Sequence, residues 1–140
     1  MAESRYGKYI KLGAKATTPV PGTLWAAAAS LENPDDWQGI QHRINWNYVS
    51  QPAVMENEPH SHDFDEFLCF IGSNPADKKE LGAEIEISMG KEGEKQVIDT
   101  PTVVCIPKGM VHCPINFRKV DKPVLYCNIY MSPEYVKKHA

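Results

Sequence analysis

The chain has 140 residues, 42% of them hydrophobic and 24% charged, and a formal net charge of −3. This is the length of one ordinary globular domain, and the composition excludes a coiled coil, a collagen-like chain and a chain disordered throughout. No run of lysine and arginine exceeds two residues, and no apolar stretch approaches the ~20 residues of a membrane span. We therefore expect neither nucleic acid nor a membrane as a partner.

The four cysteines are spaced through apolar runs and form no CxxC pair: Cys69, Cys105, Cys113 and Cys127. The N-terminal residues have no apolar core of the kind found in a secretory signal. We therefore expect free thiols and a cytoplasmic location.

Residues 1–35 have the least regular pattern and are expected to form an N-terminal extension, with a helical turn or a strand within 23–32. This extension could add strands to the protein's own sheet or to that of a partner. Residues 36–133 are expected to form a barrel, and residues 134–140 a C-terminal tail that could contain a helical turn.

Regular strand patterns begin after this extension. Alternation or a β-branched, apolar composition predicts strands over 40–49, 66–71, 83–89, 102–106 and 124–131. The first of these carries an apolar set on one side: Ile40, His42, Ile44, Trp46 and Tyr48. Many short strands with proline and glycine between them, and no long amphipathic helix, predict an all-β barrel or sandwich.

Four residues of ligand type stand at suggestive spacings. His60 and His62 are separated by one residue, Glu66 follows, and His112 lies fifty residues beyond His62. Residues i and i+2 of a strand project from one face about 6.6 Å apart, so two imidazoles there can converge on one ion. Glu66 reaches that ion only if the chain reverses. We expect the histidine pair to end one strand, Glu66 to open the next antiparallel strand, and His112 to open a strand after the turn at 107–109.

These segments resemble the two sequence motifs of the cupin superfamily. The first motif is represented by His60, His62, Glu66 and Gly72, and the second by Pro107, Gly109, His112 and Asn116. Two glycines of the family pattern are replaced by Val54 and Pro101, and Gly72 comes one residue early. With the surrounding strands, the resemblance covers about residues 36–132.

The resemblance implies a double-stranded β-helix, the jelly-roll barrel of cupins, with one divalent transition metal per chain. The implied ligands are His60, His62, Glu66 and His112, which leave open positions for water, substrate or oxygen. Iron, manganese, nickel, cobalt, copper and zinc all suit these donors.

Other residues are weaker candidates. Possible acid–base groups are His42, Tyr48 and Tyr126, and possible substrate contacts are Arg43, Trp46, Phe70 and Asn116. The preferred interpretation places His42 in the core and the aromatic residues in the core or an interface, and leaves Arg43 exposed on its strand. Asn116 shares the strand parity of His112 and could support that ligand or cap a turn. Cys113 is expected to face away from the metal.

The sequence thus predicts a metal-dependent enzyme acting on a small organic molecule, either dioxygenase-like or a lyase or isomerase. The alternative is a non-catalytic cupin that binds or senses a sugar or another small ligand. We also expect a homodimer.

Overall fold

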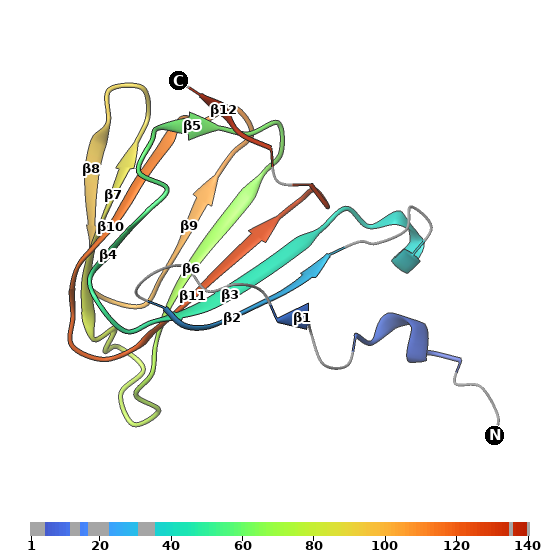
Figure 1. Cartoon of the computed structure of the whole chain (residues 1–140), viewed down its shortest axis with the longest axis horizontal. Helices are drawn as coiled ribbons and strands as arrows, with labels where there is room; N and C mark the ends of the chain where they lie inside the picture. Colours follow the sequence, from blue (N-terminus) through green and yellow to red (C-terminus); the bar gives the residue numbers. More distant parts are fainter. Residues whose placement is uncertain (1–4, 12–14, 17–22, 31–35, 135, 140) are drawn as a thin grey trace.

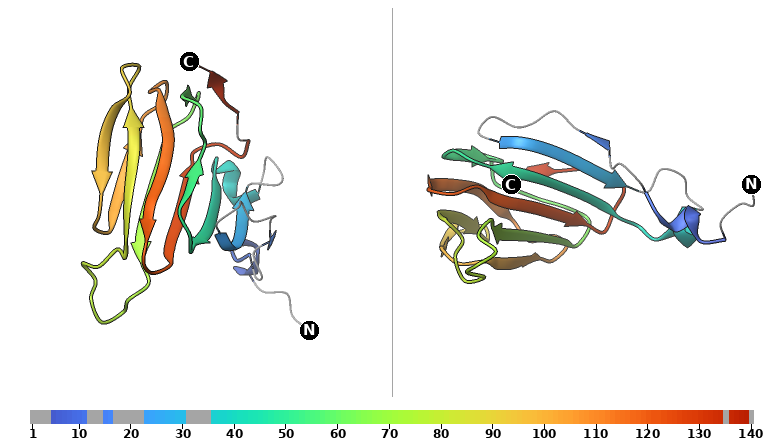
Figure 2. Two further views of the ribbon diagram at one scale, coloured as in Figure 1. Left: turned by 60° about the vertical axis from the view of Figure 1, so that its left-hand side comes forward. Right: turned by 90° about the horizontal axis from the view of Figure 1, so that it is seen from below.

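A computed structural model of the chain describes residues 5–11, 15–16, 23–30, 36–134 and 136–139. Two antiparallel β-sheets face each other (Figures 1 and 2). Sheet A has the strand order β1-β2-β3-β11-β6-β9, and sheet B has the order β12-β5-β10-β7-β8, with β4 also paired to β10. The strands are β1 Lys15–Ala16, β2 Thr23–Ser30, β3 Arg43–Val49, β4 Ala53–Met55, β5 His60–Ser61, β6 Glu66–Gly72, β7 Ala83–Met89, β8 Glu94–Ile98, β9 Thr102–Ile106, β10 His112–Val120, β11 Val124–Tyr130 and β12 Lys138–His139. Two short 3-10 helices cover Gly7–Tyr9 and Asp36–Gly39.

The all-β class is confirmed, and the strands with the clearest patterns lie where they were predicted. β7 and β9 have the predicted bounds, while β6 and β11 differ from them by one residue at one end. No described helix has the length and apolar character needed to cross a membrane.

The two ends of the chain contribute strands. β2 pairs with β3, so residues 23–30 extend the protein's own sheet A. The helical turn considered for 134–139 is wrong, because β12 pairs with β5 in sheet B. Part of the proposed extension 1–35 lies outside the described residues, and the division at 35 and 133 remains a prediction.

The hydrophobic core lies between the two sheets. Phe70 of β6 stacks on Tyr126 of β11 with ring centroids 5.0 Å apart, and Phe117 of β10 packs edge-on to Tyr126 at 5.7 Å. Phe70 and Phe117 are fully buried, so these rings join sheet A to sheet B. Burying such side chains contributes about 1.5–3 kcal/mol each.

The strand β3 turns its polar side inward, opposite to the expected orientation. Its register with β11 places Val49 opposite Val124 and Arg43 opposite Tyr130, and directly opposed residues share a face of the sheet. Val49, Val124 and Tyr130 are buried. Arg43, Asn45 and Asn47 therefore face the interior, and Ile44, Trp46 and Tyr48 face outward. The alternating pattern predicted the strand correctly, but the prediction that its apolar side faces the interior is wrong.

The strand β10 changes its parity near its start. The pairing of β10 with β7 shifts between His112 and Ile115, where an irregularity interrupts the ladder. Ile115 and Phe117 are buried, so Asn116 projects from the opposite face of sheet B. The expected shared parity of Asn116 and His112 is therefore not found.

Gly72 ends β6 at a close approach to the following loop. A Cβ atom at this position would lie 2.0 Å from the backbone carbonyl oxygen of Glu80. Only glycine fits there. This requirement accounts for the glycine that closes the first motif in this chain.

Candidate metal centre

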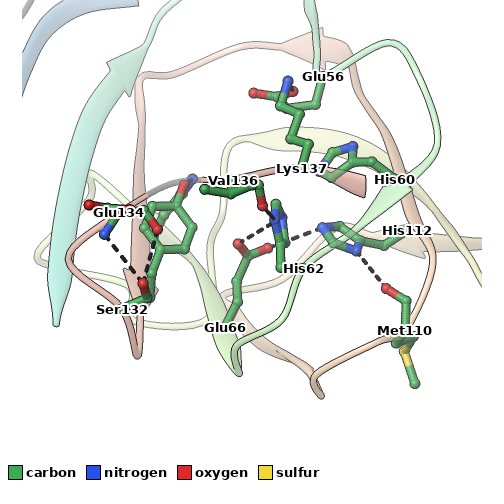
Figure 3. Close-up of polar contacts among 12 residues, drawn as sticks. Glu56, His60, His62, Glu66, Met110, His112, Ser132, Glu134, Val136 and Lys137 are labelled. Carbon is green, nitrogen blue, oxygen red and sulfur yellow. Dashed lines mark hydrogen bonds and ion pairs between the residues drawn. The ribbon is translucent and has the colours of Figure 1, made fainter. Parts of the chain in front are cut away.

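His60, His62, Glu66 and His112 converge at one end of the sandwich (Figure 3). All four residues are at most 2% exposed. The histidines offer one ligand atom each, and these atoms lie within 4.8 Å of one another. The Glu66 carboxylate lies beside them, with Oε2 3.5 Å from His62 Nε2 and Oε1 3.2 Å from His112 Nε2.

The cluster is assembled from both sheets. His60 lies in β5 and His112 opens β10, both in sheet B, whereas Glu66 opens β6 in sheet A. His60 and His112 are also direct cross-strand partners. The chain therefore reverses between β5 and β6 by crossing from one sheet to the other.

Hydrogen bonds to the backbone set the tautomer of each imidazole. The Nδ1 atom of His60 lies 2.9 Å from the carbonyl oxygen of Glu58, and that of His112 lies 3.0 Å from that of Met110. The Nδ1 atom of His62 lies 2.6 Å from the carbonyl oxygen of Val136. A carbonyl oxygen only accepts, so Nδ1 donates and Nε2 keeps its lone pair for a metal.

The surroundings of His60 favour its neutral imidazole form. Burial lowers the pKa of His60, and the neighbouring His112 and His62 act in the same direction, while the bond to the Glu58 carbonyl opposes them. Neutral imidazole is the form that binds metal. Three buried imidazoles with lone pairs turned inward, beside a buried carboxylate, form a metal-binding triad with an adjacent oxygen donor.

The C-terminal segment covers this centre. Besides the Val136 carbonyl, β12 pairs with β5, and Lys138 Nζ lies 2.8 Å from Asp63 Oδ1. Lys137 forms an ion pair with Glu56 (Figure 3). Sequence reasoning missed this support, because the group that holds His62 is a backbone atom.

Tyr130 is another neighbour that sequence reasoning missed. Tyr130 of β11 is the cross-strand partner of Glu66 in β6. The centroid of its ring lies 6.5 Å from that of the His62 ring. Burial, followed by the charge of Glu66, raises the pKa of Tyr130, so the phenol stays protonated. The available signal was its position in β11, four residues after Tyr126 and thus on the same face.

The weaker candidates are dispersed. Phe70 and Tyr126 pack in the core, and Trp46, Tyr48 and Asn116 project from the outer faces of the sheets. Cys113 is buried, and burial raises its pKa well above the usual range. Arg43 lies on the inner face of sheet A, where it is opposite Tyr130, and Tyr130 is in turn opposite Glu66.

His42 is a packed residue. Its ring stacks on that of Trp37 with centroids 4.7 Å apart, and its Nδ1 atom lies 2.7 Å from the carbonyl oxygen of Ile40. It precedes β3 instead of belonging to it.

Comparison with solved structures identifies the fold of this chain. Oxalate decarboxylase of Bacillus subtilis, described with Mn(II) centres, superposes with a TM-score of 0.57 at 10% identity, over 91% of this chain and 30% of the other. KdgF from Halomonas sp. superposes with a TM-score of 0.55 at 16% identity, over 90% of this chain and 92% of the other. Both are cupins. The chain has the cupin fold.

The expectation from the two sequence motifs is thus confirmed for the fold. The cupin fold of this chain spans less than a third of the length of oxalate decarboxylase but nearly all of KdgF. No protein-family model and no curated protein matches the sequence. At these identities the likeness establishes architecture, and activity must be argued from the site.

Proposed function

We propose that this chain is a metal-dependent enzyme that acts on a small organic molecule inside the barrel. The observation that carries the proposal is the buried set of three inward-facing Nε2 atoms and one carboxylate. Such a set fills four positions of a six-coordinate ion and leaves two for water, substrate or oxygen. A divalent metal held there would supply Lewis-acid or oxygen chemistry.

Two residues beside the cluster, Tyr130 and Phe64, could contact a substrate held at the ion. Tyr130 offers a protonated hydroxyl on the inner face beside Glu66, and Asn128 donates from Nδ2 to that hydroxyl at 2.7 Å. Tyr130 can therefore donate a hydrogen bond or a proton to a substrate atom held at the ion. Phe64 stacks on His62, with centroids 4.7 Å apart, and keeps that side of the cluster apolar.

The test begins with the metal. Protein purified without added metal is analysed for Fe, Mn, Ni, Co, Cu and Zn, and we expect close to one equivalent of one of them. Metal-loaded protein is then incubated with small hydroxy and keto acids, with and without oxygen, while products and oxygen uptake are recorded. Tight metal binding without turnover of any substrate would favour the non-catalytic, ligand-binding alternative. Absence of stoichiometric metal would refute the proposal.

We also propose a cytoplasmic homodimer formed through the outside of sheet A. The registers of β3, β11, β6 and β9 place only apolar and thiol side chains there. This outer apolar face consists of Ile44, Trp46, Tyr48, Phe67, Cys69, Ile71, Val103, Cys105, Leu125, Cys127 and Ile129. Four strands make it roughly 19 Å wide.

A second copy is the occupant that fits this face. Uncharged apolar patches of this extent mark interaction sites, and a twofold dimer requires a self-complementary patch. Val103 is 66% exposed on this face, and Val97 is 56% exposed on β8 of sheet B. Light scattering after size exclusion should show a dimer, a monomer for Val103→Lys, and a dimer for the control Val97→Lys. A monomeric wild-type protein at micromolar concentration would contradict the proposal.

A further inference from the structure

The inner wall of the barrel next to the metal centre carries an arginine. Arg43 of β3 is directly opposite Tyr130 of β11, and Tyr130 is directly opposite Glu66 of β6. These three residues form one row across three adjacent strands, with side chains on the same face. Neighbouring strands are about 5 Å apart, so the Cα atoms of Arg43 and Glu66 are separated by about 10 Å. The long arginine side chain can bridge most of that separation.

The guanidinium group has no counter-ion among the described residues. No described carboxylate forms an ion pair with Arg43, and its Nε atom is buried without a hydrogen-bond partner. In contrast, Arg118 on the outside of sheet B contacts both Glu84 and Glu86, with N–O distances of 2.5 and 2.8 Å. The residue is partly buried as a whole, but its buried Nε donor is costly to leave without a partner, and natural proteins leave few buried donors unsatisfied.

A second unsatisfied atom lies one step along the same face. Asn128 pairs with Asn45 in the register of β11 and β3, and its Oδ1 atom is buried without a hydrogen-bond partner. Among the described residues, the inner face of sheet A that carries Glu66 thus also presents an unused donor on Arg43 and an unused acceptor on Asn128. A carboxylate would satisfy the first, and a hydroxyl or amine of the same molecule would satisfy the second.

We propose that Arg43 binds the carboxylate of the substrate, so that the substrate class is small organic acids bearing a hydroxyl or amino group. This inference rests on the proposed function, because it concerns a substrate whose reacting group is held at the metal. Arg43 would bind the carboxylate at the other end of that substrate. Arg43 thereby orients the substrate along the row Arg43–Tyr130–Glu66. The bidentate geometry of guanidinium suits a carboxylate and explains an arginine at this position.

Binding measurements on the metal-loaded protein test the inference independently of turnover. Lactate, malate and glycolate are titrated calorimetrically into wild type, Arg43→Gln, Arg43→Lys and the control Arg118→Gln, with glycerol as an uncharged probe. We expect at least one acid to bind wild type and Arg118→Gln equally, to bind Arg43→Gln at least tenfold more weakly, and to bind Arg43→Lys with intermediate affinity. Glycerol should not distinguish the variants.

A second readout separates a ligand-binding role from a structural one. Arg43 is only partly buried and forms no ion pair with a described residue, so it should not be needed for stability, and Arg43→Met should melt at the same temperature as wild type or higher. Metal content measured in each variant keeps a failure of the metal centre distinguishable from a failure of this inference. Equal affinity of wild type and Arg43→Gln for the acids, or binding of none of them by wild type, would overturn the inference. A large drop in melting temperature for Arg43→Met would also overturn it.

Discussion

His62 donates a hydrogen bond from Nδ1 to the backbone carbonyl oxygen of Val136, 2.6 Å away and 74 positions later in the chain. The corresponding bonds of His60 and His112 are local, because each acceptor lies two residues before the histidine. One ligand of the metal centre is therefore oriented by a segment that is remote in sequence. The affinity for metal should depend on the docking of that segment.

Deleting residues 134–140 should weaken metal binding by about 10–100-fold, the usual cost of losing a partner that orients a metal ligand. Competition with a chromophoric chelator measures this change. The matched control is Lys137→Ala with Lys138→Ala, which removes two partly exposed ion pairs but keeps the backbone of β12. Because such pairs contribute little, the double variant should bind metal almost as wild type does. An unchanged affinity after the deletion would show that Val136 does not orient His62.

Replacing His112 should abolish stoichiometric metal binding. His112→Ala removes one of three nitrogen donors and leaves Glu66 without its closest imidazole, 3.2 Å away. His139→Ala is the control, because His139 is exposed and its side chain contacts the exposed carboxylate of Glu58, while its backbone pairs with His60. Elemental analysis of both proteins, purified in parallel, should find metal in the control alone. Equal metal in the two variants would refute the assignment.

Metal occupancy should fall steeply as the pH is lowered from 7 to about 5. Imidazoles must be neutral to coordinate, and their ordinary pKa is about 6.5, so protons compete for several ligands together. Bound metal measured by equilibrium dialysis should therefore decrease with a slope above one proton per metal. A slope of one would contradict a site with three histidines.

The metal-free protein should also lose stability on acidification. Burial holds the pKa of His60 in the folded protein below its value in the unfolded chain. The unfolded chain then takes up the proton first, so the contribution is complete above about pH 6.5 and is lost as the pH falls towards the folded pKa. Urea unfolding of the metal-free protein at pH 7.5 and 5.5 measures this, and His60→Gln should reduce the difference.

Chelation at neutral pH should lower the melting temperature without unfolding the chain. A ligand at a thousandfold excess over its dissociation constant stabilises the native state by about 4 kcal/mol. The core around Phe70 and Phe117 lies between the sheets and needs no metal for its packing. The far-ultraviolet circular dichroism of the chelated protein should therefore match that of the metal-loaded protein at 20 °C. A random-coil spectrum would contradict this.

Strand positions and the clustering of four ligand-type side chains could be predicted from the sequence because both follow local rules. The alternating pattern located β7 from Ala83 to Met89. The spacing of the two motifs predicted that His60, His62, Glu66 and His112 lie close together. The choice of which face of β3 lies inside could not be predicted. It depends on the partner strand, and β11 places its buried Tyr130 opposite Arg43.

Two further features depend on contacts that no short pattern encodes. The irregularity after His112 reverses the parity of β10, so Asn116 leaves the interior. The carbonyl of Val136 is a backbone group that any residue type could provide. Both the irregularity and the tail are consequences of tertiary pairing.

The proposed ligands of the metal centre come from opposite layers of the sandwich, with Glu66 in sheet A and His60 and His112 in sheet B. A bound ion would thus act as a clasp that fastens the two layers at one end, while the aromatic core fastens them elsewhere. Removing the ion should release only the clasped end. Hydrogen exchange should accelerate at the amides of β5, β12 and the first residues of β6 and β10, and remain slow around Phe70 and Phe117.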